Sequence, residues 1–420
     1  MTAPALRVEL LFQPLSSFFE YFTLDDDVLG VLDGDAPLAS DTVLVDVTDD
    51  VRSVSIRRGR QREIDEFGPG TCSVTLNNDA RKYDPVNEDS PYYGNIEPRR
   101  MLYVTAVVDG VDYPLYRGYV QRWTVDYSQP TLPLAGIVAA DALSLLARQE
   151  LTPIAAAHAG DLPGARIGRV LDLDEVAFPA DLRDLDDGVS TLGATTYEQA
   201  GGNAGRYLQL VAQTDQGALF ASKAGVLTFV DRDAAPGDSQ ATFSDDGEAS
   251  SIKYLTIDQD FSDDLLYNRI VVAGTTANEQ TVSDSDSIDA YGVATLQRTD
   301  LLASSDTDML DQARVLLARF GTPEMRLRQV VVDVADLADE RQAELLGLDL
   351  NARVTAVRTP PGGGTPASIE QAALVNGLEW SFVASPQSMR AVVTLAAGKR
   401  AIGFVLDDDD LGVLDDDYLT

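Results

Sequence analysis

The stretch MLYVTAVVDGVDYPLYRGYVQRWTVDY, residues 101–127, predicts the fold of the first part of the chain. Two runs rich in β-branched and aromatic residues flank Asp109-Gly110. A two-residue hairpin turn of this type needs positive φ, which Asp and Gly tolerate, so the pair is a strong signal for an antiparallel hairpin. The segment therefore predicts two adjacent strands joined by a tight turn.

Strand patterns continue on both sides of this hairpin. Apolar and polar residues alternate in VRSVSIRRG, residues 51–59, and again in TCSVTLNND, residues 71–79, which ends in turn residues. TLPLAGIVA, residues 131–139, adds a further strand. Together these runs predict one antiparallel barrel or sandwich over about residues 46–140.

The pattern changes after this first β region. ADALSLLARQEL, residues 140–151, predicts a short amphipathic helix, and a later hairpin turns on residues 223–225. Strand-like runs resume at Ile252 and are interrupted by one clear helix, residues 306–321. The sequence thus predicts a mainly β, α+β chain in which two antiparallel β-barrels flank a small α/β insert. The expected divisions are an N-terminal extension (1–45), a first barrel (46–140), the insert (141–250), a second barrel (251–400) and a C-terminal extension (401–420).

Composition narrows the possible functions. The 420 residues carry a formal net charge of −36, which argues against a chain whose main task is to grip DNA. No apolar run is long enough to predict a membrane span, and the N-terminus does not match a secretory signal. The single cysteine, Cys72, is expected in the core, and with one histidine, His158, a Cys/His zinc site is excluded. No pair of carboxylates stands out as catalytic, so the sequence predicts a protein that is not an enzyme and has no cofactor.

An acidic phrase occurs twice, near the two ends of the chain. FTLDDDVLGVLDGD, residues 22–35, and FVLDDDDLGVLDDD, residues 404–417, agree at eleven of fourteen positions. Neither copy fits an EF-hand loop, because Leu29 and Leu411 stand where an oxygen ligand is needed; looser binding of a divalent cation by the aspartates stays open. We expect each copy to dock on a sheet through its leucines while its aspartates face water. The docking residues so predicted are Leu24, Leu29, Gly30, Leu32, Leu406, Leu411, Gly412 and Leu414.

Basic residues cluster in two places, RRGRQRE at residues 57–63 and RR at residues 99–100. Nucleic-acid binding is one interpretation of the first cluster. The other is a rim that contacts an acidic neighbouring chain, and we favour it because arginine suits ion pairs at interfaces. The predicted rim residues are Arg57, Arg58, Arg60 and Arg62.

Several of these stretches together resemble a known family. VRSVSIRRGRQREIDEFGPGTCSVTLNNDARKYDP, SPYYGNIEPRRMLYVTAV and YPLYRGYVQRW resemble the first barrel of minor tail proteins from long-tailed bacteriophages (siphoviruses) of actinobacterial hosts. Later stretches, among them ADALSLLA, LVAQTDQGALFASKAGVLTFVDR and LLARFGTPEMRLRQVVV, look like successive parts of the tail hub, or baseplate hub. The resemblance covers about residues 45–400 and rests on packing and turn patterns.

The resemblance implies a homotrimer at the distal tip of the virion tail. Each chain would carry two tail-tube-like barrels, so that three chains form a ring of six. The ring would join the sixfold tail tube and distal tail protein to the tape measure and the threefold fibre or spike proteins at the tip. DNA would be present only in transit, through a channel whose carboxylates repel phosphate. Two acidic phrases per chain would match the six barrels.

Two other functions stay open. The β regions of a receptor-binding module would hold host-wall carbohydrate, with the aromatics of SPYYG (residues 90–94), Trp123 and Trp380 as candidates, although Trp123 lies on an alternating strand and is expected in the core. A tail-associated murein hydrolase is the third reading, against which the near absence of histidine and of metal motifs counts. A ring-shaped trimer with an axial hole would favour the hub over both.

Overall fold

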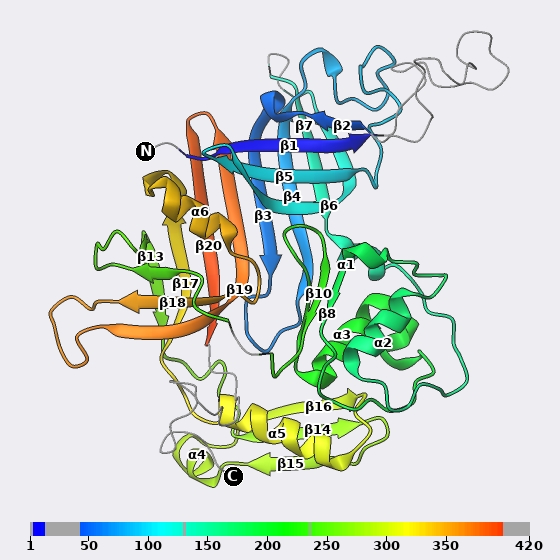
Figure 1. Cartoon of the computed structure of the whole chain (residues 1–420), viewed down its shortest axis with the longest axis vertical. Coiled ribbons are helices and arrows are strands. Elements are labelled where there is room, and N and C mark those ends of the chain that lie inside the picture. The colour runs from blue at the N-terminus through cyan, green and yellow to red at the C-terminus, as the bar shows by residue number, and fades with distance from the viewer. Residues whose placement is uncertain (1–2, 13–42, 129–131, 235–236, 398–420) are drawn as a thin grey trace.

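The computed structural model describes residues 3–12, 43–128, 132–234 and 237–397. Most strands in these ranges belong to one 14-stranded sheet, and two three-stranded sheets lie with helices beside and beneath it (Figure 1). The chain is therefore mainly β with an α+β arrangement, as the sequence predicts. None of the helices in the described ranges is long and apolar enough to cross a membrane.

The first half of the large sheet is an antiparallel array with the strand order β3-β4-β7-β6-β5. Asp109 and Gly110 both have positive φ in the turn from β5 to β6, which confirms the predicted hairpin. β1 and then β2 extend the sheet beyond β5, so part of the predicted N-terminal extension is a strand of this sheet. The bounds are β1 Ala5–Phe12, β2 Val43–Asp46, β3 Val51–Gly59, β4 Gly68–Asn77, β5 Met101–Val108, β6 Val111–Asp126 and β7 Leu134–Ala140.

The second half repeats this arrangement with the order β13-β17-β20-β19-β18, again antiparallel throughout. In both halves, the five strands lie side by side as first, second, fifth, fourth and third along the chain. A register shift interrupts the fourth strand at a matching place, between Val120 and Arg122 in β6 and between Val375 and Gly377 in β19. β11 and β12 extend the sheet beyond β18. The bounds are β11 Thr242–Ser244, β12 Ile252–Lys253, β13 Thr256–Asp260, β17 Arg326–Asp333, β18 Arg353–Arg358, β19 Ile369–Ala384 and β20 Gln387–Ala397.

A single strand pair joins the two halves. β3 is antiparallel to the later part of β19, from Ser53 opposite Val383 to Gly59 opposite Gly377. The sequence predicts two separate barrels, whereas in the described residues the pairing closes neither half on itself and links both into one sheet. The prediction fails here because alternation shows which face of a strand is buried but does not identify the neighbour of an edge strand.

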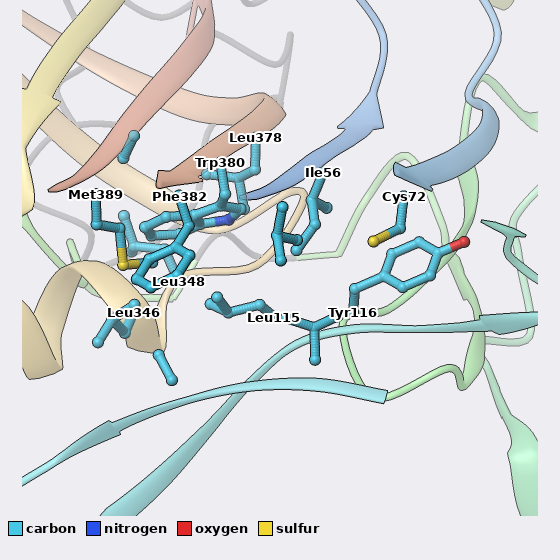
Figure 2. Close-up of a cluster of buried hydrophobic side chains, with 14 of the residues drawn as sticks. Ile56, Cys72, Leu115, Tyr116, Leu346, Leu348, Leu378, Trp380, Phe382 and Met389 are labelled. Atoms are coloured by element: carbon cyan, nitrogen blue, oxygen red, sulfur yellow. The ribbon is translucent and has the colours of Figure 1, made fainter. Parts of the chain in front are cut away.

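One hydrophobic core runs across this seam. Trp380 and Phe382 of β19 lie near Ile56 of β3, with Leu348 and Leu115 close by (Figure 2). Separating the halves would expose this apolar surface to water, at about 25 cal/mol for each Å². Cys72 is buried in the same cluster, as the sequence predicts.

The insert between the halves has its own core. Its three helices pack with the antiparallel β9–β10 hairpin, and β8 is parallel to β10. The predicted hairpin at residues 223–225 is confirmed, and Gly225 supplies a positive φ. The predicted helix at 140–151 is present but shorter. The bounds are α1 Ala142–Leu146, α2 Pro163–Leu171, β8 Arg183–Leu185, α3 Ala204–Asp215, β9 Ala218–Ala221 and β10 Leu227–Val230.

A small α/β unit interrupts the second half between β13 and β17, where the first half has only the loop 60–67. The sequence predicts its strands as part of the second barrel, but they form a separate three-stranded sheet packed on α5. The predicted helix that stops at Gly321 is confirmed, and the Ser305 side chain caps its start. The bounds of this unit are β14 Arg269–Gly274, β15 Gln280–Ser283, α4 Ser285–Tyr291, β16 Thr295–Leu301 and α5 Asp306–Phe320. Outside it, α6 Asp339–Gly347 follows β17. Short 3-10 helices in the described residues are η1 Thr48–Asp50, η2 Asp79–Arg81, η3 Ala180–Leu182, η4 Gln199–Gly202 and η5 Val334–Asp336.

Candidate functional site

The predicted site residues fall into two groups. The docking repeat lies outside the described residues, so its leucines and glycines receive no structural account: Leu24, Leu29, Gly30, Leu32, Leu406, Leu411, Gly412 and Leu414. The predicted rim arginines at 57–62 are described. They lie at the end of β3 and in the loop after it, where the two halves, the insert and the small α/β unit meet.

Arg58 lies inside the chain rather than on a rim. Its side chain is 2 % exposed and forms an ion pair with Asp349, at 2.7 Å between Nη2 and Oδ1. The same Nη2 also donates to the Ala221 carbonyl at 2.7 Å. Since Asp349 precedes β18 and Ala221 ends β9, one guanidinium ties the first half to the second half and to the insert.

Lys223 completes this set from the hairpin of the insert. Its backbone N–H donates to Asp349 Oδ2 at 2.8 Å, and its ammonium donates to the carbonyls of Leu346 and Leu348 at 2.8 and 3.2 Å. These carbonyls lie at the C-terminal end of α6, where a cation is favoured by the helix dipole. Burial lowers the pKa of Lys223, and the Asp349 carboxylate opposes that shift.

Arg60 fastens the next part of the loop to β19. Its Nε donates to Asn376 Oδ1 at 2.7 Å, its Nη1 donates to the Asp65 carbonyl at 2.8 Å, and its guanidinium lies 4.4 Å from the centroid of the Phe67 ring. Asn376 sits at the register shift of β19 described above. We call the set Arg58, Arg60, Lys223, Asp349 and Asn376 the central junction.

The same loop also holds the insert and the small α/β unit. Gln209 of α3 donates to the Phe67 carbonyl at 2.9 Å, and Arg298 of β16 donates to the Ile64 carbonyl at 3.3 Å. Glu63, which is buried, forms an ion pair with Arg319 of α5. The loop 60–67 therefore contacts every part of the chain that meets here.

Arg57 and Arg62 differ from Arg58 in exposure. Arg57 pairs with Glu379 across the β3–β19 seam at 3.1 Å, with side chains 54 % and 40 % exposed. Arg62 pairs with Asp65 at 2.7 Å and is also largely exposed. The structure thus splits the predicted cluster into a buried junction and a solvent-facing part, and the role of the exposed arginines toward another chain stays a prediction.

Sequence reasoning missed the partners of these arginines. Lys223 was placed only as a turn residue, and Asp349 is one of 68 acidic residues with no local feature that distinguishes it. The sequence feature that could have singled out Lys223 is the scarcity of lysine. The chain has only four lysines, and one of them occupies the tip of a predicted hairpin.

Asp141 is a second buried charge near the junction. It caps α1, accepts hydrogen bonds from the backbone N–H of Gly70 at 2.6 Å and of Leu143 at 3.0 Å, and is 4 % exposed. Burial raises the pKa of its carboxyl to about 7, against the opposing effects of these donors and of the nearby Arg58. Ionising this group inside the protein is therefore unfavourable relative to water.

Replacing Asp141 with asparagine should change the pH dependence of stability. Because the folded pKa of about 7 exceeds the unfolded one, the folded protein binds an extra proton between pH 4 and 7, and the free energy of unfolding falls as pH rises through this range. The free energy of unfolding of the native chain, taken relative to that of the variant, should therefore fall with rising pH, by up to about 1.4 kcal/mol per pH unit. Urea unfolding across this range measures it, with exposed Glu88→Gln as the matched control; parallel curves would contradict the assignment.

The aromatic residues proposed for carbohydrate are mostly engaged inside the chain. Trp380 is 4 % exposed in the shared core. Trp123 stacks on Tyr83 with ring centroids 6.4 Å apart, and its Nε1 donates to the Glu97 carbonyl. Tyr92 packs against the same Tyr83 ring, which leaves Tyr93 as the more exposed tyrosine of its pair. The ring faces that a sugar platform needs are thus largely used in packing.

The central junction and its surroundings brace the parts of the chain against one another. Arg58 Nη2 and Lys223 are engaged with Asp349 and with backbone carbonyls, while Arg58 Nη1 is buried without a hydrogen-bond partner among the described residues. A small cavity beside the junction, of about 60 Å³, is lined in part by Arg60, Glu63 and Arg319. Such an arrangement fixes how four parts of the chain are oriented.

Comparison with models of known protein families gave no match, and neither did comparison with curated protein sequences. Among solved structures, the 43 kDa tail protein of prophage MuSo2 from Shewanella oneidensis is 12 % identical with a TM-score of 0.56, over 85 % of this chain and 96 % of that chain. The tail protein from Neisseria meningitidis MC58 is 10 % identical with a TM-score of 0.56, over 95 % of this chain and 98 % of that one. Neither supports an actinobacterial host. The chain shares the fold of these two tail proteins along nearly their whole length.

Proposed function

We propose that this chain is a structural protein of a bacteriophage tail, a hub at the distal tip that works as a homotrimer and without catalysis. The fold supports the first part, because two tail proteins, one of them from a prophage, share it over almost their entire length. The hub would join the sixfold tail tube and distal tail protein to the tape measure and the threefold fibre or spike proteins.

The repeated strand order is the observation that carries the symmetry of this proposal. One chain contains the order β3-β4-β7-β6-β5 and then the order β13-β17-β20-β19-β18. Three such chains present six similar sheet units while the assembly itself keeps threefold symmetry. A protein between a sixfold tube and a threefold tip needs this combination.

Charge supports a role as a conduit for DNA. Each chain carries a formal net charge of −36, and a channel lined by carboxylates repels the phosphate backbone. DNA would then pass through the ring without binding to its wall, and higher salt would weaken the repulsion within a screening length of about 8–10 Å.

The assembly state tests the proposal directly. Native mass spectrometry of the purified full chain should give a species of three times 45.2 kDa, in equilibrium with smaller forms at low concentration. Averaged images of the phage tail tip should show three copies of the chain around a central channel. Six copies of the chain per tail, or labelling by a specific antibody anywhere but the distal tip, would contradict it.

A further inference from the structure

The seam between the halves shows how two such units pair. β19 pairs with β18 only as far as Leu374, and from Gly377 onward the same edge of β19 pairs with β3. β3, the first strand of the first half, therefore occupies the part of the β19 edge that the shorter β18 leaves open. This is the only contact of its kind within the described chain.

The strands that correspond to β3 and β19 in the other half are β13 and β6, and in the described chain they do not pair with each other. β13 corresponds to β3 by strand order and pairs only with β17. β6 corresponds to β19; β5 covers it only as far as Tyr119, so that residues 121–126 have β7 as a strand neighbour on one side only. Most residues of both segments are exposed, and the exposed apolar residues Leu255 and Phe261 flank β13. Open edges of this kind are templates for strand addition.

We propose that β13 of one copy adds as an antiparallel strand to residues 121–127 of a second copy, at the end of β6, and so repeats between copies the β3–β19 pairing within the chain. The proposal rests on the proposed homotrimer and names the surface that forms it. In Figure 1, β13 lies at the left of the molecule, and β6 lies to its right in the upper half of the large sheet. Such a contact is heterologous, and it closes into a ring when the rotation between copies permits.

The ladders inside each half determine the register between copies. The two halves can be aligned at the register shifts in β6 and β19, and the alignment then follows the paired residues from strand to strand. Four positions of the first half thereby correspond to four of the second: Val54 to Ile257, Ser55 to Asp258, Tyr127 to Phe382 and Asp126 to Ser381. Within the chain, Val54 opposes Phe382 and Ser55 opposes Ser381. Between copies, Ile257 should therefore oppose Tyr127, and Asp258 should oppose Asp126.

The side chains at these positions give the contact a defined character. Tyr127 is 45 % exposed and Ile257 is half-buried, so their meeting would bury apolar surface as the pair Val54 and Phe382 does in the core. Asp126 and Asp258 instead bring two carboxylates opposite each other, which weakens a strand pair. The isolated chain should therefore associate less tightly than its apolar contacts alone would suggest.

A pair of engineered cysteines tests the register. Directly opposed strand residues have Cα atoms about 4.5–5.5 Å apart, which suits a disulfide. The full chain carrying Asp126→Cys and Asp258→Cys should give, on oxidation, covalent trimers on a non-reducing gel, because each copy holds both halves of the link. Each single variant should stay monomeric on the gel, because its thiol faces an aspartate and the only native thiol, Cys72, is buried.

The control is Val125→Cys with Asp258→Cys, in which a shift of one residue places the thiols on opposite faces of the sheet. We expect at least a tenfold lower yield of cross-link from it. A trimer by mass in which the matched pair fails to link, or links no better than the offset pair, overturns the edge pairing and leaves the homotrimer standing. A chain that stays monomeric and unlinked at every concentration overturns both.

The opposed carboxylates give a second measurement. Asp258→Asn should tighten self-association roughly twofold to fivefold at low salt, because it removes the like-charge pair. Sedimentation measures the change, with Glu88→Gln as a control that alters the net charge equally at an exposed site outside the contact. Equal gains from both variants, or no gain from Asp258→Asn, would count against the register.

Discussion

Replacing Arg58 with alanine should lower the free energy of unfolding by about 3–5 kcal/mol. The Arg58 side chain is 2 % exposed, and its loss would leave the Asp349 carboxylate, which is 24 % exposed, without its ion-pair partner. It would also remove the side-chain donor to the Ala221 carbonyl. Both groups belong to other parts of the chain, so the insert and the second half should loosen together. Urea denaturation followed by circular dichroism measures the loss.

Arg57 provides the matched control for this prediction. It precedes Arg58 on the same strand, points to the other face, and forms its ion pair with Glu379 where both side chains are substantially exposed. Exposed pairs of this kind contribute about 0–1 kcal/mol, so Arg57→Ala should be nearly neutral. Equal losses from the two variants would show that charge, and not the buried junction, decides the effect.

Gly59→Ala should destabilise the chain by more than about 3 kcal/mol. Gly59 has a φ of +96°, and an added Cβ would lie 2.6 Å from Gly377 Cα and still closer to the Asn376 carbonyl oxygen. These are backbone atoms of β19, which cannot move aside without opening the seam between the halves. The unfolding midpoint in urea and the cooperativity of the transition measure the effect, since an opened seam would let the halves unfold separately.

Gly68, at the other end of the same loop, is the comparison for Gly59. An added Cβ there has no atom within 4 Å. Gly68→Ala should therefore change stability by about 0.5 kcal/mol or less, as substitutions away from special features do. A mild effect at both glycines would mean that the backbone of β19 yields at Asn376.

Local patterns predicted the strands and helices that local chemistry determines. The hairpin at Asp109-Gly110 follows from the φ values that this pair tolerates, and the helix that ends at Gly321 follows from an apolar face with a cap and a stop. The pairing of β3 with β19 joins residues more than 300 positions apart, and nothing in the alternation of either strand specifies the other. The same limit explains why the sequence pattern assigns the strands of the small α/β unit to the second β region.

The candidate site shows this limit at the level of single residues. The arginine cluster stood out in the sequence because like residues lie close together in it. Its division into buried Arg58 and exposed Arg57 depends on Asp349 and Ala221, which lie 291 and 163 residues further along the chain. Residues so far apart in the sequence show no local pattern that marks them as partners. The positive charge of the cluster can therefore be read from the sequence, but its role as an internal brace cannot.

The pairing of β3 with β19 also determines when the large sheet can be completed during synthesis. The first half can form its strand ladder soon after residue 140 is made, but the edge of β3 has no partner until β19 follows. At rates of about 5–20 residues per second, synthesis from Ala140 at the end of β7 to Ala384 at the end of β19 takes roughly 12–49 s. For that interval an open, apolar strand edge faces the cell, so the nascent chain should depend on chaperone binding more than the finished protein does.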